Sequence, residues 1–198
     1  MWLEPLLVAG QLLAIMNPFG GAVTFLSLTH GLGEEERRRI ARDAFLYIVV
    51  LLLVFTLGGT WLLEIFHVSV PGLRLGGGIL LMAVAVDMLS GAPRSKKIDP
   101  VEIAAVPIST PLIVGPGTMA TSILLATKYP LYSLVPGAVM AALATYLVLK
   151  YSGILVRVVG FNAMKALGRF MSIIIASIAA DMIVSALRDY YAGFRPPA

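Results

Sequence analysis

The long stretches without charge limit the fold of this chain more than any other feature. A helix that crosses a bilayer needs about 20 mainly apolar residues, and four uncharged stretches are that long. They are Pro5–Thr29, Ala44–Leu63, Ile103–Thr127 and Tyr129–Leu149. Two further apolar stretches, 68–89 and 170–187, are interrupted by charged residues. Counting all six predicts an all-α integral membrane protein with six transmembrane helices, although the interrupted two could be re-entrant or interfacial helices.

The composition supports a membrane protein over a soluble one. Hydrophobic residues make up 59% of the 198 residues and charged residues 13%, against about 45–50% and about 25% in soluble domains. A soluble fold of this size has too little interior to bury so many apolar side chains. Residues 1–20 lack the basic start of a cleavable signal peptide, so we expect them in the mature protein. The absence of cysteine excludes disulfides and thiolate metal sites.

The positions of the basic residues predict the orientation. Eleven of the 15 Lys and Arg residues lie on one side of the predicted spans, in clusters at 37–42, 94–97 and 150–169. Such a bias marks the cytoplasmic side, so we expect a multi-pass protein of the cell (inner, cytoplasmic) membrane with both termini outside. The net charge of +4 is therefore a topology signal, and it does not indicate nucleic-acid binding. The run EEERRR at 34–39 is expected to be a solvated charged loop or helix start.

The first stretch is broken at its middle, and the break recurs later in the chain. Asn17-Pro18 and the glycines that follow remove a backbone donor and lower helix propensity. Aligning Pro18 with Pro116 places NPFGGAVTFLSLT (17–29) over GPGTMATSILLAT (115–127), with Thr24 opposite Ser122. A similar shift places the interrupted third stretch on the interrupted sixth, and Asp87 on Asp181.

This recurrence predicts two inverted repeats of three helices, with the first and fourth helices broken. The first repeat is 1–92, a cytoplasmic linker is 93–102, and the second repeat is 103–198. Because three spans is an odd number, the second copy enters the membrane from the opposite face. Paired broken segments in inverted repeats mark the binding site of a transporter, since irregular backbone inside a membrane must be packed in protein or line a wet cavity.

The breaks predict a site for a small zwitterion. Second half-helices that begin near Gly20–Gly21 and Gly117–Thr118 would present free N–H groups to a carboxylate. The carbonyl groups that end the first half-helices, at Met16 and Val114, would accept hydrogen bonds from an ammonium. The candidate substrate-binding residues are Asn17, Pro18, Gly20, Gly21, Thr24, Gly115, Pro116, Gly117, Thr118, Thr121 and Ser122. The alternative is structural, because proline can simply kink a membrane helix and glycine can simply permit close packing.

Three motifs in order resemble the MarC-related family of membrane proteins, which includes the SnatA-like neutral amino acid transporters. They are MNPFGGAVTFLSLT, SVPGLRLGGGILL (69–81) and VPISTPLIVGPGT (106–118). The resemblance covers nearly the whole chain. It implies a six-helix secondary transporter that moves small neutral amino acids such as glycine and alanine together with protons.

The family motifs map onto particular residues of this chain. The proline motif of the first span maps to Asn17, Pro18 and Gly20, and Gly-Pro-Gly of the fourth to 115–117. Pro-Gly-x-Arg of the third span maps to Pro71, Gly72 and Arg74. Many members carry Asp-Pro, often followed by Gly-Asn, where this chain has Asn17-Pro18 and Gly20-Gly21. A proton or cation site therefore cannot be transferred to position 17.

Ionisable residues inside the spans are the remaining candidates, because charge is costly in a membrane and usually functional there. For coupling the order is Asp181, then Asp87 and Arg74; Arg74 could instead pair with a carboxylate, cap a helix or extend outward. No residue cluster has metal-ligand spacing, and no set indicates an enzyme or a cofactor. The predicted partners are a small neutral amino acid such as glycine, alanine or serine, the lipid bilayer and protons, with a homo-oligomer left open. The alternatives are an exporter or facilitator of another small polar solute, and a non-transporting membrane subunit.

Overall fold

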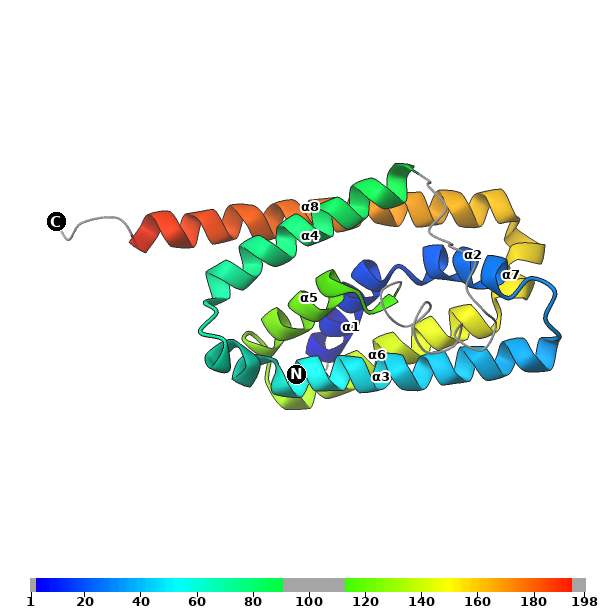
Figure 1. The fold of residues 1–198 in the computed structure, drawn as a ribbon, viewed down its shortest axis with the longest axis horizontal. Helices are drawn as coiled ribbons and strands as arrows, with labels where there is room; N and C mark the ends of the chain where they lie inside the picture. The colour runs from blue at the N-terminus through cyan, green and yellow to red at the C-terminus, as the bar shows by residue number, and fades with distance from the viewer. Residues whose placement is uncertain (1–2, 91–112, 194–198) are drawn as a thin grey trace.

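The computed structural model describes residues 3–90 and 113–193, which contain a series of α-helices. The helices are α1 (Leu3–Met16), α2 (Pro18–Leu28), α3 (Glu34–Ile65), α4 (Val70–Ser90), α5 (Pro116–Ala126), α6 (Leu131–Lys150), α7 (Ser152–Val159) and α8 (Phe161–Gly193) (Figure 1). The predicted linker 93–102 and the first part of the predicted fourth span lie outside the described residues.

The helices confirm an all-helical membrane protein. Within the described residues, α3, α4, α6 and α8 are each long and apolar enough to cross a membrane. The pair α1 and α2 is a fifth candidate span, bent by 44° at its break, and α5 is a shorter apolar helix. The interrupted stretches form the continuous helices α4 and α8, so both are long enough to cross as single helices.

Local chemistry explains where several helices begin and end. Pro18 and Pro116 each open a helix, since the first helical position needs no N–H and favours the fixed φ of proline. Helix α3 begins ten residues before the predicted span, with Glu34, Glu35 and Glu36 in its first turn. Acidic residues there stabilise the positive end of the helix dipole, so the EEERRR run is a helix start. The short helix α7, which was not predicted, ends at Gly160, whose φ of 91° favours glycine.

Glycine contacts bring the helices together closely. Helix α4 lies along α8 (Figure 1), and a Cβ atom at Gly78 would come within 2.9 Å of the Ala179 carbonyl oxygen. Helix α1 packs on α6 in the same way, because a Cβ at Gly137 would lie 2.6 Å from the Val8 side chain. Small residues at such contacts are typical of membrane helices, whose association depends on close backbone approach.

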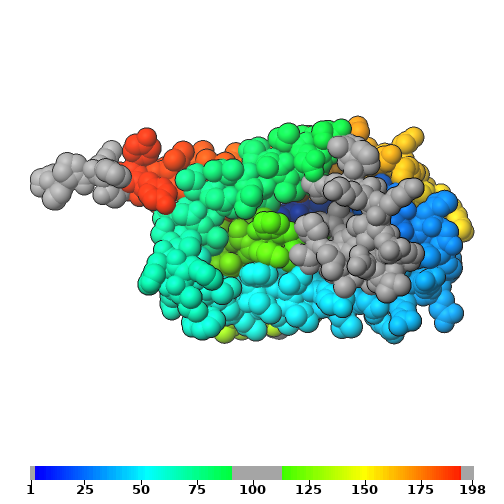
Figure 2. Space-filling model, viewed as in Figure 1, coloured from blue at the N-terminus to red at the C-terminus, as the bar shows by residue number. Residues whose placement is uncertain are grey.

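Helix α5 lies recessed inside this bundle. It packs against α3 and α4, and the space-filling view shows it set back between them (Figure 2). Helix α2, which also follows a break, packs against α8. Large apolar side chains such as Trp61 and Val158 are 64% and 78% exposed, as expected for surfaces that face lipid.

Candidate functional site

Asn17 forms the break between α1 and α2. This residue is 1% exposed and adopts the left-handed conformation, with φ 43° and ψ 65°, which asparagine tolerates better than most residues. Its Oδ1 accepts a hydrogen bond from the Gly20 N–H (3.1 Å), and its Nδ2 donates to the Gly168 carbonyl on α8 (3.1 Å). Asn17 therefore caps α2 and ties the break to α8.

Asn17 and Gly168 pack tightly against the start of α2 at Gly20. A Cβ at Gly20 would lie 2.9 Å from Asn17 Nδ2, and a Cβ at Gly168 would lie 3.2 Å from the Gly20 Cα. The Gly20 N–H is already paired with Asn17, and the Thr24 hydroxyl donates to the Gly20 carbonyl (3.3 Å). In this conformation the Gly20 N–H, which was predicted to bind the substrate carboxylate, forms a hydrogen bond within the protein.

The second break opens α5 and lies close to the first. Gly115 is the N-cap in extended conformation, without a side-chain cap, and Pro116 follows. Gly117 is buried, and a Cβ there would overlap the Leu81 side chain of α4. A Cβ at Gly21 would lie 3.5 Å from Ile113 Cγ1, so the structure brings the two breaks together across the bundle.

The hydroxyl groups after the second break differ in what they bind. Thr118 donates to the Ile113 carbonyl (3.0 Å), and Ser122 donates to the Thr118 carbonyl (2.9 Å). Thr121 is 6% exposed, and its Oγ1 has no hydrogen-bond partner among the residues that the structure describes. Leaving such a buried group unsatisfied costs about 1–3 kcal/mol, so Thr121 is the one of these three hydroxyl groups that could gain from a further partner.

Thr121 faces a pocket of about 370 Å³ between α1, α4, α5 and α8. The polar residues that line it are Gln11, Arg74, Thr121, Lys128, Asp181 and Ser185. Its apolar residues are Ile15, Leu124, Leu125, Ile178 and Met182. The pocket thus unites one predicted binding residue with two of the three predicted coupling residues, and places two cations and one carboxylate around a single space.

Arg74 is held at this pocket by a carboxylate that sequence reasoning missed. Its Nη1 lies 2.6 Å from Asp189 Oδ2 on α8; the side chain of Arg74 is 20% exposed and that of Asp189 is 47% exposed. A carboxylate partner for Arg74 was one of the expected alternatives, but Asp189 lies just beyond the apolar stretch 170–187. Asp87, the third coupling candidate, lies near the opposite end of α4 and does not line the pocket.

Within residues 3–90 and 113–193, no group of three or more histidine, aspartate or glutamate side chains is arranged to hold a metal ion. The pocket offers hydrogen-bonding groups and side chains of opposite charge. The fold and pocket together define a multi-pass, all-helical membrane protein with a polar pocket enclosed by four of its helices.

Comparison with known proteins narrows this class to one family. Residues 5–191 match the family described as MarC family integral membrane protein, and the chain belongs to that family. It is 32% identical to a UPF0056 membrane protein from Methanocaldococcus jannaschii, covering 92% of this chain and 95% of the relative. It is 28% identical to the UPF0056 inner membrane protein YhgN of Escherichia coli, covering 96% and 99%.

A further relative is the UPF0056 membrane protein YvbG of Bacillus subtilis, which is 29% identical over 91% of this chain and 92% of the relative. No solved structure matches the chain significantly. The family resemblance of the sequence motifs is therefore confirmed.

Proposed function

We propose that this protein is a secondary active transporter of small neutral amino acids, namely glycine, alanine and serine, coupled to protons. The observation that carries the proposal is the pocket that Arg74, Lys128 and Asp181 line together with Thr121, whose buried hydroxyl has no hydrogen-bond partner among the described residues. A neutral amino acid carries one carboxylate and one ammonium. The two cations suit the carboxylate, and Asp181 suits the ammonium.

The size and lining of the pocket are compatible with a small polar substrate. Its volume of about 370 Å³ lies near the lower end of the range for small-molecule sites, about 300–1,000 Å³. Apolar side chains such as Leu124 and Met182 form much of the remaining wall, and they suit a short aliphatic side chain. Thr121 and Asp181 then supply hydrogen bonds that fix the orientation of the substrate.

The helix contacts support an internal two-fold arrangement of residues 1–92 and 103–198. Helix α2 packs on α8, and α5 packs on α4. In the two predicted repeats α2 corresponds to α5, and α8 corresponds to α4. The two contacts are therefore equivalent under the internal symmetry. We infer that these repeats move against one another in alternating access. The residues of the two breaks, which meet where Gly21 approaches Ile113, would then line the substrate path inward from the pocket.

The orientation inferred from the basic residues makes this an outward-facing site. Arg74 and Lys128 lie toward the end of the bundle where α1 begins and α8 ends (Figure 1). That end carries few of the basic residues, so the positive-inside rule places it outside the cell. Substrate from outside would meet the charged residues first and Thr121, several residues deeper along α5, afterwards.

Uptake of radiolabelled glycine into proteoliposomes, with and without a pH gradient, tests the proposal. Thr121→Val keeps the shape of the side chain and removes the hydroxyl, so we expect glycine affinity to fall about tenfold, equivalent to 1.4 kcal/mol. Thr145→Val is the matched control, because Thr145 is also buried but donates within α6 to the Ala141 carbonyl (2.9 Å). The control should transport like the parent.

Two results would contradict the proposal. If the parent moves neither glycine nor alanine nor serine, the protein is a carrier of another solute or a non-transporting subunit. If Thr121→Val and Thr145→Val both take up glycine like the parent, substrate does not bind in this pocket.

A further inference from the structure

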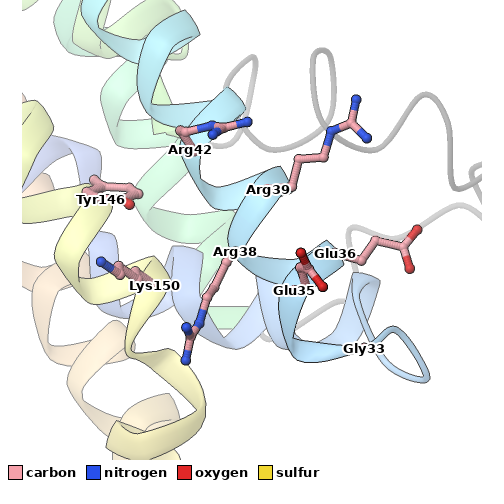
Figure 3. A pocket seen from close by; sticks show the side chains of 8 residues that line it. All are labelled: Gly33, Glu35, Glu36, Arg38, Arg39, Arg42, Tyr146 and Lys150. Carbon is pink, nitrogen blue, oxygen red and sulfur yellow. The ribbon is translucent and has the colours of Figure 1, made fainter.

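A second, larger hollow lies at the opposite end of the bundle, between the first turns of α3 and the last turn of α6. Its volume is about 750 Å³, and the residues that line it are shown in Figure 3. Four of them are cations, Arg38, Arg39, Arg42 and Lys150, and two are carboxylates, Glu35 and Glu36. We call this the α3–α6 hollow. It shares no residue with the pocket around Thr121.

The cations of the α3–α6 hollow are placed to receive an anion. Figure 3 shows Arg38 extending from α3 toward α6, whereas Glu35, Glu36 and Arg39 extend on the side of α3 away from α6. Lys150 Nζ lies 5.6 Å from the centre of the Tyr146 ring and 5.3 Å from the centre of the Tyr151 ring, distances at which cation–π attraction contributes. With four cations and two carboxylates, the lining of the hollow carries a net positive charge.

The existing ion pairs of these arginines are weak enough to be exchanged. Arg38 pairs with Glu34 at 3.4 Å, and the two side chains are 66% and 81% exposed. Arg42 Nε is 3.9 Å from Asp43 Oδ1, with the Arg42 side chain 65% exposed. Exposed pairs of this kind contribute little, whereas a phosphate can accept two parallel hydrogen bonds from a guanidinium.

An apolar surface continues from the α3–α6 hollow into the membrane. Following Arg38 and Arg42 at the same four-residue spacing, Leu46 and Val50 are 56% and 57% exposed. On α6, Leu147 and Leu143 precede Lys150 by three and seven residues and are 43% and 45% exposed. Residues at these spacings share one face of a helix. Charge at the helix ends with apolar side chains beside it matches the two parts of a phospholipid.

We propose that the α3–α6 hollow binds the phosphate of an anionic phospholipid, whose acyl chains lie along the exposed side chains of α3 and α6. The apolar continuation favours a lipid over a free phosphate ion, because a free ion would gain nothing from those side chains. Basic pockets at the ends of membrane helices are suited to such headgroups. This proposal does not depend on what the protein transports.

Lipid retention measured by native mass spectrometry tests the proposal. The purified full chain is incubated in detergent with equal amounts of phosphatidylglycerol and phosphatidylcholine, and the bound lipids are counted. The parent should prefer phosphatidylglycerol. Neutralising Arg42 or Lys150 alone to Gln should lower that preference about fivefold, since each change removes a charge-assisted hydrogen bond to the phosphate.

The triple change Arg38→Gln, Arg42→Gln and Lys150→Gln should abolish the preference. The matched control is the triple change Arg157→Gln, Lys165→Gln and Arg169→Gln, which removes three cations from α7 and α8 outside the hollow. It should keep the preference within about twofold of the parent. Size-exclusion elution identifies any variant that fails to fold. If the triple variant fails to fold, the lipid preference of the single variants tests the proposal.

Three results would overturn the proposal. The first is equal retention of both lipids by the parent. The second is loss of the preference in the control as well as in the hollow variant, which would make it an effect of net charge. The third is displacement of phosphatidylglycerol by inorganic phosphate at matched concentration, which would identify the hollow as a site for the free ion.

Discussion

Replacing Asn17 by alanine should destabilise the protein by about 3 kcal/mol, from three contributions. Loss of the cap on the Gly20 N–H costs about 0.5–2 kcal/mol. Loss of the hydrogen bond to the Gly168 carbonyl costs about 0.6–1.7 kcal/mol, the range for polar contacts between membrane helices. The lower part of that range applies, because the Ser172 hydroxyl also donates to this carbonyl at 3.1 Å. Holding alanine in the left-handed conformation costs about 1–2 kcal/mol.

Two other substitutions at Asn17 separate these contributions. Asn17→Gly avoids the cost of the left-handed conformation and loses only a few tenths of a kcal/mol as a cap, so it should cost about 1 kcal/mol, mainly from the bond to α8. Asn17→Asp keeps the acceptor for Gly20 but turns a second oxygen toward the Gly168 carbonyl. It should cost at least as much as glycine, although a carboxylate suits a helix N-terminus.

The free energy of unfolding is measured by titrating sodium dodecyl sulfate into detergent micelles and following helical circular dichroism. Ser172→Ala is the control, because it removes the other donor to the Gly168 carbonyl without touching α2; it should cost less than about 1 kcal/mol. Equal destabilisation by alanine and glycine would refute the left-handed conformation at Asn17. Parental stability of Asn17→Asp would refute the hydrogen bond to α8.

Three further predictions concern the pocket and its surroundings. Gly117→Ala should destabilise by about 1–3 kcal/mol, because the new methyl group overlaps Leu81; adding Leu81→Ala should recover part of the loss, and parental stability of Gly117→Ala would contradict this packing. Asp181→Asn should change glycine affinity by less than about tenfold but abolish accumulation driven by a pH gradient, whereas unchanged accumulation would place the proton site elsewhere. In competition for glycine uptake, alanine and serine should inhibit far better than leucine or phenylalanine, and equal inhibition by phenylalanine would mean a wider pocket.

The positions of the membrane-spanning helices were predictable from hydropathy, and the break at Pro18 was predictable from the backbone chemistry of proline. The break at Pro18 was expected, but its second half-helix begins at Pro18 and not near Gly20, since proline fits the first helical position. The start of α3 at Glu34 was less predictable, because hydropathy marks only the part of a helix that crosses lipid. Helix α7 was missed since eight residues are too few for a span.

Three of the residues that line the pocket were singled out from the sequence, but their assembly into one pocket was not predicted. Thr121 was chosen for its place after a break, and Arg74 and Asp181 for their charge inside a span. Their common pocket depends on which faces of α4, α5 and α8 point toward one another. A sequence that is apolar on all sides of a helix does not indicate that orientation. Asp189 was missed because it lies past the apolar stretch, where a carboxylate looks like ordinary surface.

The bond between Asn17 and Gly168 has a consequence for synthesis of the protein in the membrane. The two residues are 151 positions apart, so at roughly 5–20 residues per second the ribosome reaches Gly168 roughly 8–30 seconds after Asn17. During that interval the Asn17 amide has no partner from α8, although unmet polar groups are costly in lipid. Glu4 likewise awaits Ser133, whose hydroxyl donates to its carboxylate at 2.6 Å. The first half of a nascent chain should therefore stay beside the insertion machinery, sheltered from lipid, until the second half arrives.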